Sequence, residues 1–87
     1  MAQDDEPLIS IIAVNFNGKI FLKNLFNSIL SIDYPSEKIQ IIMVDNNSTD
    51  GSVDFVREEF PQVEIITLAK NKGYAGGNNE GFNRSKG

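Results

Sequence analysis

A strand followed by a polar turn lies at the centre of the chain, where residues 39–52 read IQIIMVDNNSTDGS. Residues 39–44, apolar except for Gln40, are typical of a strand buried on both faces, as in a parallel sheet. The polar residues after them form a turn that ends in good helix N-cap side chains, and Asp50 is the expected cap. A short apolar stripe then predicts a helix over residues 51–60, which Pro61 ends.

The same order of strand, turn and helix is repeated on both sides of this segment. Apolar runs predict further strands over residues 8–14 and 63–68. A helix is predicted over residues 19–31, and a third helix over residues 75–86 is expected to be capped by Gly87. Connections of this length favour parallel strands joined by right-handed crossovers. The sequence therefore predicts an α/β, three-layer, Rossmann-like half of a doubly wound fold, with β-α-β-α-β-α order, strand order 3-2-1 and an incomplete sheet.

The composition excludes several classes of site. The 87 residues include no cysteine and no histidine, which excludes a thiol or imidazole nucleophile, a Ser-His-Asp triad and a thiolate or imidazole metal site. A net charge of −4 argues against a nucleic-acid partner, because such binding needs clustered lysine and arginine. Residues 1–7 are expected to form a flexible acidic tail, unlike the basic start of a signal peptide. The missing cysteines are consistent with a cytoplasmic protein.

Polar side chains follow the end of each predicted strand. Because parallel strands end at one edge of a sheet, these turns meet at the carboxyl edge, where such folds bind ligands. One carboxylate, Asp45, lies among many asparagines: Asn15, Asn17, Asn46, Asn47, Asn71 and, just beyond the third turn, Asn78 and Asn79. Asparagine is also simply a good turn residue, but three helix N-termini at this edge are suited to phosphate. The sequence therefore predicts a nucleotide or another phosphorylated ligand.

The two common phosphate-binding motifs are absent from the sequence. Gly18 alone follows the first strand, where the dinucleotide motif G-x-G-x-x-G would stand, and no G-x-x-x-x-G-K-[ST] P-loop occurs. A glycine-rich segment, GYAGG, occupies residues 73–77 after the third strand. It fits either close packing of a helix on the sheet or close approach of the backbone to a ligand.

Three segments carry a resemblance to a known family: residues 11–18 read IIAVNFNG, residues 42–52 read IMVDNNSTDGS and residues 71–79 read NKGYAGGNN. In this order and spacing they resemble the family 2 glycosyltransferases of the GT-A fold, and most closely the rhamnosyltransferase-like branch. The resemblance covers nearly the whole chain after residue 7. It implies that residues 8–87 are the N-terminal nucleotide-sugar-binding portion of a GT-A domain, truncated before its metal-binding D-x-D motif.

The resemblance also implies a reaction and its partners. A hexosyl or rhamnosyl group would pass from a UDP- or dTDP-sugar to the hydroxyl of an acceptor glycan or lipid. This reaction would serve cell-wall or polysaccharide biosynthesis, at the cytoplasmic face of a membrane in the full-length protein.

The resemblance further assigns nucleotide-binding residues. Val14, Asn15 and Phe16 would line the nucleoside pocket, and Asp45 would accept a hydrogen bond from the ring N3–H of uracil or thymine. The other implied contacts are Asn17 in the first turn, Asn47 as a buttress of the second turn, Lys72 and Gly73 closing over the base or diphosphate, and Gly76, Gly77 and Asn78 allowing the third helix to approach. The alternatives are structural, with Asp45 as a turn carboxylate and Lys72 as a solvated loop lysine.

Two departures limit what the resemblance implies. Residues 76–78 read Gly-Gly-Asn where many relatives carry Ala-Arg-Asn, so an arginine contact to the diphosphate is in doubt. The D-x-D motif, which holds Mg or Mn in the full-length enzyme, and the catalytic base are expected beyond residue 87. We therefore expect no catalytic residue and no metal ligand in this chain, and an inactive fragment.

Two other interpretations stay open. The chain could be a non-catalytic half-Rossmann module that binds a nucleotide or a protein, or a Rossmann-like fragment without a ligand. In each case the open strand edges of a short sheet predict self-association.

Overall fold

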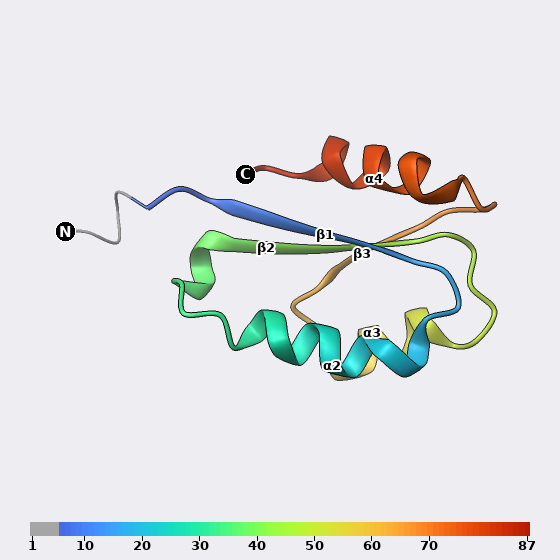
Figure 1. The fold of residues 1–87 in the computed structure, drawn as a ribbon, viewed down its shortest axis with the longest axis horizontal. Helices are drawn as coiled ribbons and strands as arrows, with labels where there is room; N and C mark the ends of the chain where they lie inside the picture. The colour runs from blue at the N-terminus through green and yellow to red at the C-terminus, as the bar shows by residue number, and fades with distance from the viewer. Residues whose placement is uncertain (1–5) are drawn as a thin grey trace.

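The three strands form one parallel sheet in the order β1-β2-β3, in a computed structural model that describes residues 6–87. The elements are, in chain order, β1 (Ile9–Asn15), α2 (Lys19–Leu30), the short 3₁₀ helix η1 (Ser36–Lys38), β2 (Ile39–Asp45), α3 (Ser52–Glu59), β3 (Glu64–Thr67) and α4 (Gly73–Arg84). Helices α2 and α3 cover one face of the sheet, and α4 covers the other (Figure 1). The predicted α/β class, three layers, parallel strands and strand order are confirmed.

The register of the sheet brings the ends of the strands to one level. β1 pairs with β2 along its whole length, from Ile9 opposite Ile39 to Asn15 opposite Asp45. Asp45 also pairs with Thr67, the last residue of β3. The turns after all three strands therefore start side by side at the carboxyl edge.

An apolar core holds α2 and α3 against the sheet. Leu22, Phe26 and Ile29 lie at helical spacing on α2 and are buried. The ring of Phe26, which is fully buried, lies 5.4 Å from the ring of Phe60, measured between centroids. Met43 of β2 completes this cluster from the sheet side. The core on this face fixes the strands whose ends carry the polar turns.

Helix α4 packs closely on the opposite face of the sheet through two buried glycines. A Cβ atom at Gly77 would lie 2.7 Å from Val14 Cγ1, and a Cβ atom at Gly81 would overlap Ile12 and lie 3.2 Å from Val44 Cγ2. Both distances are too short for carbon–carbon contact. Close helix–sheet packing, one of the two interpretations of the glycine-rich segment, is therefore what Gly77 provides.

The predicted bounds of the third helix are wrong, whereas the other predicted elements agree to within one residue at each end. α4 begins at Gly73, whose N–H donates to Asn71 Oδ1 at 2.7 Å, two residues before the predicted start. It ends at Arg84, and Ser85 is already extended. Lys86 N–H donates to the side-chain oxygen of Gln40 at 2.8 Å. Gly87 therefore does not cap the helix.

Two other expectations concern the start of the chain and membrane spans. The predicted tail lies mainly outside the described residues; of its last two, Pro7 accepts a hydrogen bond from the Tyr34 hydroxyl through its carbonyl oxygen. Within residues 6–87, no helix is long and apolar enough to cross a membrane.

Candidate functional site at the carboxyl edge

The carboxylate of Asp45 lies at the centre of the carboxyl edge and is only 2% exposed. Its Oδ1 accepts hydrogen bonds from Asn15 Nδ2 at 2.9 Å and from Ser48 Oγ at 2.8 Å. Its Oδ2 accepts one from the Ser48 N–H at 2.8 Å. A carboxylate offers about four acceptor sites, so one site on Oδ2 is left over. Asp45 thus organises the turns, and it keeps limited capacity for a donor on a ligand.

The first and second turns are joined by a reciprocal pair of hydrogen bonds. Asn17 N–H donates to Ser48 Oγ at 2.8 Å, and Thr49 N–H donates to Asn17 Oδ1 at 2.8 Å. Asn17 and Asn47 adopt left-handed backbone conformations, with φ of 52° and 67°, which asparagine tolerates better than most residues. The asparagines of these turns therefore shape the backbone as well as supplying polar groups.

The second and third turns are joined by the side chain of Asn46, which is buried. Asn46 Oδ1 accepts from the Lys72 N–H at 3.1 Å, and Asn46 Nδ2 donates to the Gly73 carbonyl oxygen at 3.0 Å. These two bonds hold the start of α4 next to the end of β2. Neither Asn46 nor Ser48 was assigned a site role from the sequence, although both stand in the motif that carried the resemblance.

The other predicted site residues are distributed around this network. Phe16 is 54% exposed beside the first turn, and Asn47 is exposed at the tip of the second. The Lys72 ammonium pairs with Glu80 of α4 at 3.0 Å.

The remaining predicted residues lie below or along α4. Val14 lies under Gly77, and Gly73 is the first residue of the helix, with φ 74°. Gly76 lies against the Lys72 side chain, and Asn78 is partly buried. The structure thus brings Asn15, Asn17 and Asp45 into one cluster, with the start of α4 beside it.

Asp50 caps two helices at once at this edge. Its Oδ2 accepts from the Lys19 N–H, the first of α2, at 3.0 Å, and its Oδ1 accepts from the Ser52 N–H, the first of α3, at 3.0 Å. The Ser52 hydroxyl also donates to Oδ1. Partial burial acts to raise the pKa of Asp50, but these hydrogen bonds together outweigh it and hold the pKa below its usual value. The N-cap position of α3 is Gly51 rather than Asp50, but the Asp50 side chain binds the first N–H of both helices and so serves as a cap for each.

Replacing Asp50 by alanine should lower the free energy of unfolding by about 1 kcal/mol, the usual cost of a lost N-cap. Asp50→Asn should cost less, because one acceptor oxygen remains. Urea unfolding followed by circular dichroism measures both, with the exposed Asp33→Ala as the control, expected within about 0.5 kcal/mol of wild type.

The effect of Asp50→Ala should also depend on pH. A lowered pKa in the folded state stabilises the protein above the pKa of the unfolded chain, about 4, and this contribution disappears as the pH falls through the folded-state pKa. The difference between wild type and Asp50→Ala should therefore shrink below about pH 4. An equal difference at neutral and acidic pH would contradict a charged cap.

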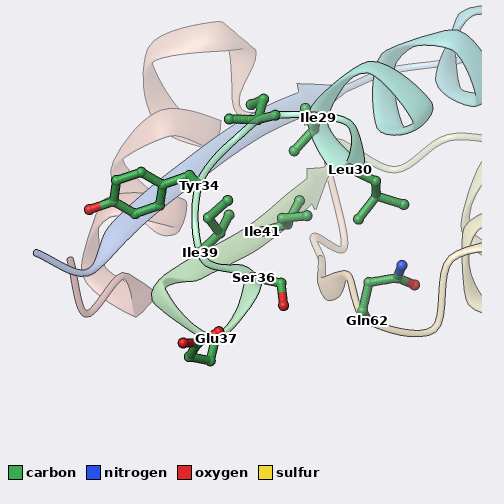
Figure 2. Close-up of a pocket in the computed structure, with 9 residues that line it drawn as sticks. Ile29, Leu30, Tyr34, Ser36, Glu37, Ile39, Ile41 and Gln62 are labelled. Atoms are coloured by element: carbon green, nitrogen blue, oxygen red, sulfur yellow. The ribbon is translucent and has the colours of Figure 1, made fainter. Parts of the chain in front are cut away.

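A pocket of about 380 Å³ lies at the other end of the sheet, between the C-terminal end of α2 and the start of β2. Figure 2 shows Ile29, Leu30, Ile39 and Ile41 around it, with Tyr34 at its margin. The pocket is therefore at the amino edge, away from the network around Asp45. No sequence pattern predicts this pocket, because its walls combine residues from separate elements.

The described residues do not fit a divalent metal. Within residues 6–87, no group of three or more acidic side chains could hold a metal ion. The carboxylates of Asp45 and Asp50 already accept hydrogen bonds from the protein. A cation of the kind that the resemblance implies would need ligands from elsewhere in a longer protein.

Known relatives share the sequence over most of this chain. Glycosyltransferase AglE of Haloferax volcanii is 27% identical over 84 residues, which cover 93% of this chain and 28% of the relative. The dolichyl N-acetyl-alpha-D-glucosaminyl phosphate 3-beta-D-2,3-diacetamido-2,3-dideoxy-beta-D-glucuronosyltransferase of Methanococcus voltae is 33% identical over 69 residues, which cover 74% of this chain and 22% of the relative. The chain spans less than a third of the length of either relative.

Solved structures share the fold. The mannosyltransferase PcManGT from Pyrobaculum calidifontis, in complex with GDP-Man and Mn2+, matches with a TM-score of 0.86 at 24% identity, over 93% of this chain and 25% of that one. TarS of S. aureus, in complex with UDP-GlcNAc, matches with a TM-score of 0.84 at 23% identity, over 91% of this chain and 24% of that one.

The three-layer α/β arrangement is that of the GT-A glycosyltransferases. Within this class, the chain belongs to glycosyl transferase family 2, whose family model matches residues 10–87. The predicted family and fold are confirmed.

Proposed function

We propose that the carboxyl edge of this chain binds the nucleoside diphosphate of a nucleotide-sugar donor, as part of a glycosyltransferase. The observation that carries the proposal is the joined set of turns around Asp45, at the edge where α/β folds bind ligands. Family membership supports a nucleotide sugar as the ligand, because the matched structures PcManGT and TarS are complexes with GDP-Man and UDP-GlcNAc.

The binding groups proposed at this edge are those that the family resemblance implies, and the geometry of the edge is compatible with them. Asp45 Oδ2 keeps an acceptor site for the ring N3–H of a pyrimidine base, and the exposed ring of Phe16 lies beside the first turn. Lys72 stands directly before α4, so its ammonium can turn from Glu80 towards a phosphate at the helix start. The other residues of the proposed surface are Val14, Asn15, Asn17, Asn47, Gly73, Gly76, Gly77 and Asn78.

Finer proposals concern the complete protein. We propose a UDP- or dTDP-sugar as donor and a glycan or lipid-linked acceptor, the latter supported by the dolichyl-linked substrate in the name of the Methanococcus voltae relative. The rhamnosyl donor, a role in cell-wall or polysaccharide synthesis, a cytoplasmic location and self-association through open strand edges belong to the same proposal. The metal and the catalytic base would come from residues outside this chain, so these 87 residues alone should transfer no sugar.

Titration of the ¹⁵N-labelled chain with millimolar UDP should shift the amide resonances of Asp45, Asn47 and Gly73 and leave those at the amino-edge pocket unchanged. Uridine, dTDP and GDP in parallel titrations separate the contribution of the base from that of the phosphates. No shift at those three amides with any of the nucleotides would refute the proposed site and leave the non-catalytic, protein-binding interpretation.

Lys72→Ala should weaken UDP binding by about fivefold, as expected for the loss of one exposed charge contact, and should leave uridine binding unchanged. The matched control is Lys70→Ala, because Lys70 is an exposed lysine two residues earlier. Equal UDP affinity of the two variants would show that Lys72 does not contact the diphosphate.

A further inference from the structure

The hydroxyl of Ser48 is the point at which the first two turns meet. It donates to Asp45 Oδ1 at 2.8 Å, accepts from the Asn17 N–H at 2.8 Å and accepts from Asn15 Nδ2 at 3.2 Å. A serine hydroxyl has one donor and two acceptor sites, and all three are used here. Ser48 therefore has no free hydrogen-bonding site for a ligand, and its hydroxyl acts within the protein.

The bonds of Ser48 determine two features of the edge. The hydroxyl of Ser48 donates to one oxygen of Asp45 and its N–H donates to the other, which fixes the orientation of the carboxylate. The bond from the Asn17 N–H holds the first turn, in which Asn17 is left-handed, against the second turn. Asn47, the predicted buttress of the second turn, is exposed and takes no part in these bonds.

We infer that Ser48 is a positioning residue for nucleotide binding, which acts by holding the Asp45 carboxylate and the Phe16–Asn17 backbone in their binding arrangement. The inference rests on the proposed nucleotide site. The inference explains why the Ser48 hydroxyl, whose hydrogen-bonding sites are all used within the protein, lies at the centre of this edge. The groups proposed to contact the ligand are instead those of Asp45, Phe16 and Lys72. Groups already ordered before binding bind more tightly, because less conformational freedom is lost.

The test compares UDP binding by wild type, Ser48→Ala, Ser48→Thr and Ser36→Ala. Ser48→Ala should weaken binding by about tenfold, the effect of one lost hydrogen bond to a charged group. Ser48→Thr keeps the hydroxyl and should restore most of the affinity. Ser36→Ala makes the same chemical change at the amino edge and should bind like wild type.

Hydrogen exchange in the absence of nucleotide separates positioning from general loss of stability. In Ser48→Ala, the Asn17 amide should exchange faster because its acceptor is gone, while the amides of the central strand at Ile42 and Val44 should exchange as in wild type. Faster exchange at all three amides would show that the variant is only destabilised, and would overturn the inference.

The binding outcomes distinguish this inference from the proposed function. If wild type binds UDP and Ser48→Ala binds it equally well, Ser48 does not position the site. If wild type does not bind UDP, uridine, dTDP or GDP, the proposed nucleotide site itself fails, and the positioning role fails with it.

Discussion

Asp45→Ala is expected to lower the free energy of unfolding by about 3 kcal/mol and to abolish UDP binding. The carboxylate is buried and accepts three hydrogen bonds, from the side chain of Asn15 and from the hydroxyl and N–H of Ser48. Alanine removes the charged acceptor and leaves these donors unpaired inside the edge, which adds to the cost of the lost bonds. A domain of this kind is stable by about 5–15 kcal/mol, so the loss is a large fraction of the total.

Urea unfolding followed by circular dichroism measures the effect of Asp45→Ala. Asp54→Ala is the matched control, because the Asp54 side chain is 94% exposed and its removal should change stability by at most about 0.5 kcal/mol. Asp45→Asn keeps the size of the side chain and serves for the UDP titration where the alanine variant is too unstable. An unfolding midpoint like that of wild type for Asp45→Ala would show that the carboxylate does not hold the turns together.

The fold could be predicted because each of its elements has a local signal. The apolar run of β2 and the helical spacing of Leu22, Phe26 and Ile29 each depend on neighbouring residues alone. The order of these elements then restricts the sheet to parallel strands with right-handed crossovers. The place of Asp45 at the centre of the edge follows from the same rule, since it directly succeeds the central strand.

The bonds within the edge could not be predicted, because they depend on register between distant residues. Ser48 lies 31 positions from Asn17, and Asn46 lies 26 positions from Lys72. The pairing of β1 with β2 brings Ser48 and Asn17 within reach of each other, and the pairing of β2 with β3 does the same for Asn46 and Lys72. The predicted end of α4 was wrong for a similar reason, since the Lys86 N–H donates to the side chain of Gln40 in β2, 46 positions earlier in the chain.

Gly81→Val is expected to lower the free energy of unfolding by about 3 kcal/mol, at the upper end of the range for overpacked cores. A Cβ atom there would overlap Ile12 and lie 3.2 Å from Val44 Cγ2, and valine adds two further methyl groups. Gly81→Ala should cost less, because the helix propensity of alanine, better than that of glycine by about 1 kcal/mol, offsets part of the overlap. Asn79→Val, on the exposed side of the same helix, is the control and should change stability by at most about 0.5 kcal/mol.

Gly81→Ala should also weaken UDP binding at the proposed nucleotide site, because α4 connects the two places. Moving α4 away from the sheet strains the two bonds by which Asn46 holds Lys72 and Gly73, so UDP should bind more weakly than to Asn79→Val. Shortening Ile12 to alanine in the Gly81→Ala background makes room for the new methyl group. The double variant should therefore be more stable than the sum of the two single changes allows, with part of the UDP affinity restored. Strict additivity in urea unfolding would show that Gly81 and Ile12 are not in contact, and that α4 is held by other means.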